Sequence, residues 1–337
     1  MLKFDSEKKV VIVGDVGTDI IVHFPKYLDE SRKRVEFTVP RMVGGGTCGN
    51  TAAAIAKLGI SPYIVGTIGD DQYGKFVVED LNKEHVHTDY LKTDKTVNTV
   101  GVFAFIDEFG ERYLWGWPRV DRSFEKLELT DVDYALIDSA DWIHSSGMVT
   151  VRDTSSRKAV EELFAYAHRK GIPTSYDLNL RVTNGVLEES FRNSTMRIVE
   201  NCSYVLGSAE EEIYYLNPGQ EWKVTAAGLA KEDRIIVARM GDKGSMIFTS
   251  KGEYEAPACR VNVVDTVGAG DVYNGAFIAC MISGCGIEET LKICNAVSGY
   301  TVAHEGARSS PDREELECFM KEKEGGQNGA SVFGLYI

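Results

Sequence analysis

The 337-residue sequence predicts an α/β protein: a mostly parallel β-sheet covered by helices, with a second, smaller β-sheet projecting from it. From about Asp141 onward, short apolar runs alternate with helical stretches, as is typical of parallel strands joined by helical crossovers. The first apolar run, Val10–Val13, is continuous, as expected for a strand buried on both faces. Alternating stretches near residues 20–40 and 99–117 fall outside this rhythm, and we interpret them as two excursions into the small sheet.

The elements of the N-terminal part follow from local patterns. Alternation of apolar and polar residues predicts strands at Ile20–Phe24 and Val35–Val39 in the first excursion. In the second excursion it predicts strands at Thr99–Ile106 and Arg112–Trp117, joined by a hairpin turn. Between the excursions we expect a helix at Ala52–Leu58, a strand at Tyr63–Ile68 and a helix at Gly74–Leu81.

The C-terminal part is predicted to consist of regular strand–helix repeats. We expect strands at Trp142–His144, Pro173–Asp177, Tyr204–Leu206 and Arg234–Ala238, and a hairpin at Ser245–Ala256. Helices are expected at Thr154–Arg169, Leu187–Val199, Glu210–Leu216, Lys223–Ala230, Ala269–Ile282 and Ile287–Ala303. The predicted organisation is a main domain of residues 1–16, 42–96 and 120–320, a lid of residues 17–41 and 97–119, and a tail of residues 321–337.

Composition narrows the class of protein. Apolar residues make up 43% of the chain, enough for a sizeable core, and 37 basic against 51 acidic residues give a net charge of −14. This charge argues against nucleic acid or an anionic membrane as partners, because both require basic patches. The seven scattered cysteines include no CxxC pair, and we expect neither a disulfide framework nor a zinc site. With no signal-like start and no apolar run near ~18 residues, a cytoplasmic location is expected.

The segment Asp265–Asp271, with the sequence DTVGAGD, is the most informative for chemistry. Gly268 and Gly270 stand at the start of a predicted helix, where free backbone N–H groups and the helix dipole form an anion site. Beside a bound triphosphate, the Asp271 carboxylate could accept the proton of an attacking hydroxyl group. The alternative is an ordinary glycine-rich turn with Asp271 as a helix cap.

A second glycine-rich segment, Gly44–Asn50, satisfies the pattern GxGxxG at Gly44, Gly46 and Gly49. Acidic residues follow about 20 positions later, as in dinucleotide-binding folds. This pattern would favour an NAD-dependent oxidoreductase. However, the preceding strand alternates and contains Pro40, and this interpretation leaves the DTVGAGD segment unexplained.

Together, the two segments resemble the signatures of the ribokinase/PfkB carbohydrate kinase family, with matching motif order from about Val10 to about Pro311. The resemblance implies a ribokinase-like fold, a doubly wound α/β domain with a small β-sheet lid. It also implies that the family's cofactors, ATP and Mg²⁺, are used, with a monovalent cation such as K⁺ in many members. No GxxxxGK[ST] element is present, so the sequence is not that of a P-loop kinase.

The resemblance also implies roles for individual residues. Asp271 corresponds to the catalytic base, and Gly268, Ala269 and Gly270 belong to the backbone anion hole. From the residues alone, Asp19 would be a turn residue and Asn50 a helix-start residue. By resemblance, the substrate-binding residues are Asp19, Gly45, Gly46, Asn50, Asp265 and Arg181, the last in a DxNxR element found in fructokinase and 2-keto-3-deoxygluconate kinase branches.

On the nucleotide side, the family has an Asn-x-x-Glu element near the Mg²⁺–triphosphate. Here Ser208 or Ala209 replaces the Asn; we favour Glu212 as the glutamate, reaching the metal through water, and a solvated acidic helix start is the alternative. The remaining residues that correspond to the ATP site are Arg239, Gly241, Gly244 and Asn295, with the segment 306–310 on the adenine side.

The sequence therefore predicts an ATP-dependent kinase that phosphorylates a hydroxyl group of a small sugar or sugar acid. A nucleoside kinase of the same family and a non-catalytic sugar or nucleotide sensor remain alternatives. The aromatic stretch Glu111–Arg119 in the predicted lid has two interpretations. Its arginines, Arg119 in particular, suit an acidic sugar, and its tryptophans, Trp115 in particular, suit a homodimer formed through the lid.

Overall fold

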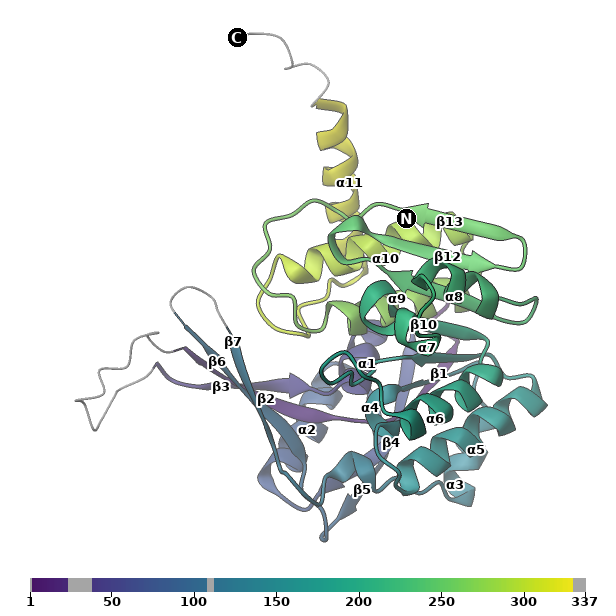
Figure 1. Ribbon diagram of the computed structural model, residues 1–337. Coiled ribbons are helices and arrows are strands. Elements are labelled where there is room, and N and C mark those ends of the chain that lie inside the picture. Colours follow the sequence, from purple (N-terminus) through teal and green to yellow (C-terminus); the bar gives the residue numbers. More distant parts are fainter. Residues whose placement is uncertain (1, 24–37, 108–111, 330–337) are drawn as a thin grey trace.

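The computed structural model describes residues 2–23, 38–107 and 112–329 and contains a large and a small β-sheet (Figure 1). The large sheet has nine strands in the order β13-β12-β11-β10-β9-β8-β1-β4-β5. The strands from β11 to β5 in this order are parallel, and β12 and β13 add antiparallel at one edge. The strands are β1 (Lys9–Val13), β4 (Ser61–Gly69), β5 (His87–Asp94), β8 (Trp142–Ser146), β9 (Thr174–Asp177), β10 (Tyr204–Ser208), β11 (Ile235–Arg239), β12 (Ser245–Thr249) and β13 (Gly252–Ala256).

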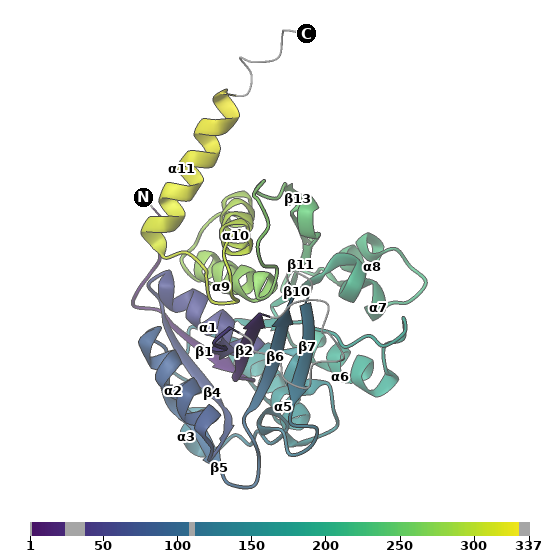
Figure 2. The same ribbon diagram turned by 90° about the vertical axis from the view of Figure 1, so that its left-hand side faces the viewer.

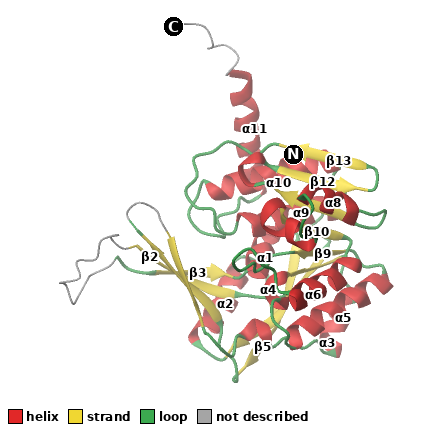
Figure 3. Cartoon of the chain, viewed as in Figure 1, coloured by secondary structure: helices red, strands yellow, loops and turns green. Residues whose placement is uncertain are grey.

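Helices cover both faces of this sheet (Figure 3). One face packs against α1 (Thr47–Lys57), α2 (Gln72–Lys83), α9 (Ala269–Ile282), α10 (Ile287–Val302) and the start of α11 (Arg313–Gly329). The other face packs against α3 (Asp131–Ile137), α5 (Ser155–Lys170), α6 (Glu189–Glu200), α7 (Tyr214–Leu216) and α8 (Trp222–Leu229). A single-turn helix, α4 (Gly147–Thr150), follows β8, and a π-helical turn at Ala209–Ile213 precedes α7.

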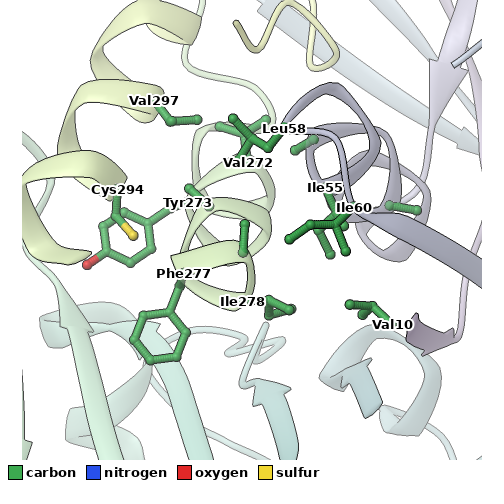
Figure 4. Packing of buried hydrophobic residues seen from close by; sticks show 14 of the residues in the cluster. Val10, Ile55, Leu58, Ile60, Val272, Tyr273, Phe277, Ile278, Cys294 and Val297 are labelled. Atoms are coloured by element: carbon green, nitrogen blue, oxygen red, sulfur yellow. The ribbon is translucent and has the colours of Figure 1, made fainter. Parts of the chain in front are cut away.

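Helix α9 lies in the middle of the hydrophobic core on the face of the sheet that is covered by α1, α2 and α10. Its side chains Phe277 and Ile278 are fully buried, and Figure 4 shows α9 between α1 and α10, with Phe277 pointing toward the strands of the sheet. Gly275 permits this close packing, because a Cβ atom there would lie 2.7 Å from the Cβ atom of Ala54 in α1. The position and direction of α9 are therefore set by tight contacts on two sides.

The small sheet has the strand order β3-β2-β6-β7 and stands away from the large one (Figures 1 and 2). Its strands are β2 (Gly17–His23), β3 (Arg41–Gly45), β6 (Val100–Ile106) and β7 (Arg112–Trp117). The two predicted excursions thus form one sheet, as expected for the lid. The predicted strand at Val35–Val39 was wrong in its described part: residues 38–39 are not in a strand, residues 35–37 lie outside the described residues, and β3 begins after Pro40.

Helices α3, α4 and α11 and strand β5 were not predicted from the sequence. Strand β5 was not predicted, because His87–Asp94 is polar and pairs only with β4 at the edge of the sheet. Helix α11 continues past residue 321, where we had predicted the tail to begin, and residues 330–337 lie outside the described part. Among the described residues, no helix is long and apolar enough to cross a membrane.

Candidate active site

The candidate site lies at the carboxyl ends of the parallel strands, next to the lid. The chain runs from β1 to β4 on one side and later to β8 on the other, so β1 is the point where the strand order reverses. Open α/β sheets bind ligands at such a point. Two cavities lie there, one of about 530 Å³ under the lid and one of about 860 Å³ beside α9 and β11.

The cavity under the lid combines carboxylates, aromatic rings and two arginines. Asp15, Asp19 and Asp271 supply the carboxylates, and Arg122 and Arg181 the cations. Other lining residues include Gly46, Thr47, Asn50, Trp117, Phe124, Met148 and Val267. Carboxylates that accept hydroxyl protons, beside an apolar ring face, suit a polyhydroxylated ring.

Asp271 lies in the first turn of α9 and faces this cavity. Its Oδ2 atom accepts a hydrogen bond of 2.8 Å from Nδ2 of Asn50, which lies in α1. Burial raises the pKa of the Asp271 carboxyl well above its usual value, and the negative charges of Asp177 and Asp15 act in the same direction. A carboxylate with a raised pKa is a stronger base, as proton abstraction from a hydroxyl group requires.

The turn before α9 is held by a second carboxylate. Asp265 is buried, and its two oxygen atoms accept hydrogen bonds of 2.8 Å from the backbone N–H groups of Val267 and Gly306. Gly268 has a φ of 78°, and a Cβ atom there would lie 2.6 Å from Ala307. The structure thus places Asp265 behind the turn; it is not among the described residues that line either cavity.

The start of α1 is built around Asp15, directly after β1. Its carboxylate accepts hydrogen bonds of 2.7 Å from both the backbone N–H and the hydroxyl group of Thr47. Gly46 has a φ of 86°, and a Cβ atom there would lie 2.7 Å from the backbone of Val16. A Cβ atom at Gly45 would lie 2.7 Å from the Asp19 carboxylate, so both glycines allow β3 to approach the strand that carries Asp19. The sequence analysis missed Asp15, although its position at the end of the first buried strand could have indicated it.

Arg239, at the end of β11, is the centre of a buried ionic cluster. Its Nη2 atom lies 2.7 Å from Oδ1 of Asp177 and 3.4 Å from Oε2 of Glu212. Burial disfavours the charge on Arg239, but these two carboxylates outweigh it and raise the pKa of the guanidinium above its usual value. Glu212 also accepts backbone hydrogen bonds from Leu180 and Ser208, and it is not among the described residues that line the two cavities.

The second cavity brings together most residues that the sequence assigned to ATP. It is lined by Arg239, Gly241, Gly244 and Asn295, and also by Ala269 and Gly270 of α9. Asn295 is held by the hydroxyl group of Ser245 and by the carbonyl groups of Ala256 and Pro257. Gly244 has a φ of 101°, where a side chain would collide with the carbonyl oxygen of Ala256.

The geometry excludes the dinucleotide interpretation of Gly44–Gly49. Gly44 and Gly45 belong to β3, which pairs antiparallel with β2 in the small sheet, whereas that fingerprint follows a buried parallel strand. Asp71, one of the two acidic residues about 20 positions after the glycines, caps α2 by accepting a hydrogen bond from the backbone N–H of Gly74, and it accepts another from the backbone N–H of Thr99.

Asp19 provides a pH-dependent prediction. Burial raises its pKa to about 6, against the attraction of Arg308. Because the pKa is raised in the folded state, Asp19 contributes stability at low pH that is lost as the pH rises through about 6. We expect the unfolding free energy of wild type, relative to Asp19→Asn, to fall between pH 4 and 7 in urea titrations. If the difference in unfolding free energy between wild type and Asp19→Asn is constant over this pH range, the pKa of Asp19 is not raised by burial.

The structure is an α/β fold with a β-sheet lid, and it has one cavity on each side of the start of α9: Ala269 and Gly270 line one, and Asp271 lines the other. The chain belongs to the pfkB family of carbohydrate kinases, which it matches over residues 7–314. The prediction of a ribokinase-like carbohydrate kinase is thereby confirmed.

Similar proteins include several sugar kinases. An ATP-dependent ribose-1-phosphate kinase from Halopiger xanaduensis is 26% identical, over 94% of this chain and 99% of the relative. A 5-dehydro-2-deoxygluconokinase from Geobacillus thermodenitrificans is 27% identical, over 95% and 96%. The structure of Arabidopsis thaliana ribokinase with ribose and ATP is similar over 93% of this chain and 99% of that one, with a TM-score of 0.71 and 22% identity. An E. coli structure with ATP and Mg²⁺ is similar over 94% and 99%, with a TM-score of 0.78 and 18% identity.

Proposed function

We propose that this protein transfers the γ-phosphoryl group of ATP to a hydroxyl group of a small sugar in the cavity under the lid. One observation carries the proposal: Ala269 and Gly270 line one cavity, while Asp271, the next residue, lines the other. The Asp271 carboxylate takes the proton of the attacking hydroxyl group. At the same time the oxygen of that hydroxyl group bonds to the γ-phosphorus, and the bond between the γ-phosphorus and the ADP oxygen breaks. The backbone N–H groups of Gly268, Ala269 and Gly270 stabilise the negative charge of the transferring group.

The side chains of the described residues are consistent with a Mg²⁺ ion that is held mainly by the nucleotide. Among the described residues, no three His, Cys, Asp or Glu side chains are grouped to hold a metal ion. Mg²⁺ usually keeps several waters and binds through substrate phosphates and one or two carboxylates, so ATP itself would hold it here. When bound, it neutralises charge on the transferring phosphoryl group.

The loop after α10 fits a monovalent cation such as K⁺. The hydroxyl oxygen of Ser310 is buried without a hydrogen-bond partner among the described residues, and Asp265 binds the N–H group of Gly306 in the same loop. A cation bound in this loop would steady the segment that packs against Gly268. We expect activity to rise when Na⁺ is exchanged for K⁺ at constant ionic strength.

For the substrate, we propose a sugar that carries an acidic group. Arg122 and Arg181 line the cavity together with three carboxylates. The arginines would bind an acidic group of the sugar, and the carboxylates would accept hydrogen bonds from its hydroxyl groups. Arg119, which the sequence analysis associated with an acidic sugar, is not among the described residues that line this cavity. Aromatic contact with the ring would come from Trp117.

The experiment is a coupled ADP-release assay with Mg·ATP and matched substrates: ribose and fructose, a sugar phosphate, 2-keto-3-deoxygluconate and several nucleosides. We expect the highest kcat/KM with an acidic sugar. Because a hydrogen bond to a charged group is worth about 1.5–3 kcal/mol, Arg181→Ala should lower the preference for acidic over neutral sugars about 10- to 100-fold. Turnover of nucleosides alone would favour a nucleoside kinase, and ATP binding without turnover of any compound would favour a sensor.

We also propose that two copies pair through the lid. Trp115 is 66% exposed and Leu114 58%, although both belong to a sheet. Trp115 and Trp117 lie two residues apart on β7 and so point to the same face, where the rings of Phe105 and Phe103 pack against them in tilted arrangements. Trp117 lines the cavity, and the exposed Trp115 is available to contact a partner.

Trp115→Ala is therefore expected to shift the protein from dimer to monomer in analytical ultracentrifugation, with a dissociation constant raised at least about 30-fold, as for an interface hot spot. Val132→Ala is the matched control, because Val132 is also 66% exposed but lies in α3, outside the lid. A monomeric wild type would contradict the proposal.

The seven free cysteines support the expected cytoplasmic location.

A further inference from the structure

Arg308 is a buried cation that no part of the proposed reaction uses. It lies in the loop between α10 and α11, and its side chain is only 8% exposed. Its Nη1 atom forms an ion pair with Asp80 of α2, its Nε atom donates a hydrogen bond of 3.3 Å to Oδ1 of Asn50, and its Nη2 atom donates one of 3.3 Å to the carbonyl oxygen of Gly45. One guanidinium thus connects α2, α1 and the end of β3.

The glycine-rich segment 44–49 makes room for this guanidinium. A Cβ atom at Gly44 would lie 2.2 Å from Nη1 of Arg308 and 2.1 Å from the Asp80 carboxylate. A Cβ atom at Gly49 would lie 3.0 Å from Nη2 of Arg308. Two of the three glycines that mimicked a dinucleotide fingerprint therefore surround an arginine side chain, which gives the pattern a physical reason.

Asn50 lies between a cation and a carboxylate, and its amide group has two different ends. Its Oδ1 atom accepts from Nε of Arg308, and its Nδ2 atom donates to Oδ2 of Asp271 at 2.8 Å. An arginine can only donate and a carboxylate can only accept, so a reversed amide group would lose both hydrogen bonds. The orientation of the Asn50 amide is thereby fixed from the side opposite Asp271.

We propose that Arg308 is a positioning residue: by fixing the amide orientation of Asn50, it holds the Asp271 carboxylate in the geometry needed to accept the substrate proton. The inference rests on the proposed role of Asp271 as the base. It assigns Asn50 a task in orienting that base, in addition to the substrate contact implied by resemblance.

The surrounding charges decide which variant is informative. Asp271 faces Asp15 from the β1–β2 connection, Asp177 from β9 and Arg239 from β11, and the hydrogen bond from Asn50 lowers its pKa against burial. Arg308 faces Asp80 and Glu84 from α2 and Asp19 from β2. Arg308→Met removes a charge as well as a hydrogen bond, whereas Arg308→Lys keeps the charge and the attraction to Asp80. A change seen in both variants therefore arises from the lost guanidinium geometry.

The first test measures kcat, KM for ATP and the pH profile of kcat in wild type, Arg308→Lys and Arg308→Met, at constant K⁺ concentration. We expect kcat to fall about 10- to 100-fold in both variants, because small misplacements of a reacting group cost about that much. The KM for ATP should stay within about threefold, because ATP is proposed to bind the other cavity. The acidic limb of the kcat profile should move to higher pH, since Asp271 loses a hydrogen bond that favours its charged form.

The second test asks whether Arg308 acts through Asn50. In an Asn50→Ala background, Arg308→Lys should lower kcat by less than about twofold, because the group that transmits the effect is already absent. Equal losses in both backgrounds would overturn the inference, as would an unchanged kcat profile in Arg308→Lys. The matched control is Arg41→Met, because Arg41 is an exposed arginine that contacts Glu305 of the same loop and should leave kcat unchanged.

The two proposals can fail separately. If Asp271→Asn keeps its turnover, the proposed base is wrong, and the role of Arg308 falls with it. If Asp271→Asn loses turnover while both Arg308 variants behave like Arg41→Met, only the positioning role is wrong. If Arg308→Met does not fold, Arg308→Lys and the Asn50→Ala background decide the matter without it.

Discussion

Replacing Asp271 with Asn is expected to lower kcat by about 10²- to 10⁴-fold, the usual contribution of a positioned general base. The amide has the shape of the carboxylate but cannot accept the proton of the attacking hydroxyl group. The hydrogen bond with Asn50 can be kept if the amide oxygen takes the place of Oδ2. Steady-state assays with the preferred sugar at saturating ATP provide the measurement.

Stability measured on the same variant separates catalysis from folding. The pKa of Asp271 is raised in the folded state, so its charged form destabilises the protein at neutral pH. The neutral amide side chain of the Asp271→Asn variant should therefore leave the melting temperature at pH 7 unchanged or higher. Asp70→Asn is the matched control, because Asp70 is an exposed aspartate outside both cavities and its loss should not change kcat. Near wild-type turnover in Asp271→Asn would refute the assignment of the base.

Arg239→Met is expected to destabilise the protein by about 3–5 kcal/mol, because it leaves the Asp177 and Glu212 carboxylates buried without their cation. Arg239 also donates hydrogen bonds to Asn274 and to the carbonyl oxygen of Gly270, so the loss extends to the first turn of α9. Urea unfolding at pH 7 measures the change. We expect activity to fall in parallel, because Arg239 lines the cavity assigned to ATP.

The matched control for this variant is Arg197→Met. Arg197 pairs with Glu161 at 2.8 Å, but its side chain is 55% exposed, and such surface pairs contribute about 0–1 kcal/mol. A loss of stability in Arg239→Met that is no larger than in Arg197→Met would show that the cluster around Arg239 is not structurally important. Its glutamate would then be free to serve the metal ion, as the sequence had suggested.

The parts of the fold that could be predicted are those with strong local periodicity. Strand β1 and helices α5, α9 and α10 were predicted within about two residues, because their apolar patterns reflect burial on two faces or along one stripe. Strand β5 carries no such pattern, since it pairs at the edge of the sheet, and β3 is placed by its pairing with Ile20 and Ile21 of β2. Edge strands are specified by their partners, and partners far away in the sequence leave no local signal.

The candidate site also has a part that local sequence predicts and a part that depends on contacts between distant residues. The sequence alone predicted an anion site at the turn before α9, from two glycines, an aspartate and a helix start within seven residues, with an ordinary glycine-rich turn as the alternative. Only the tertiary structure decided which carboxylates face the cavity and which are neutralised. The sequence assigned Glu212 and Arg239 to the ATP site, yet in the structure both belong to one buried ionic cluster that also contains Asp177. The contact of Arg308 with Asn50 joins residues 258 positions apart, and the energy of such pairs depends on burial and geometry that no local pattern records.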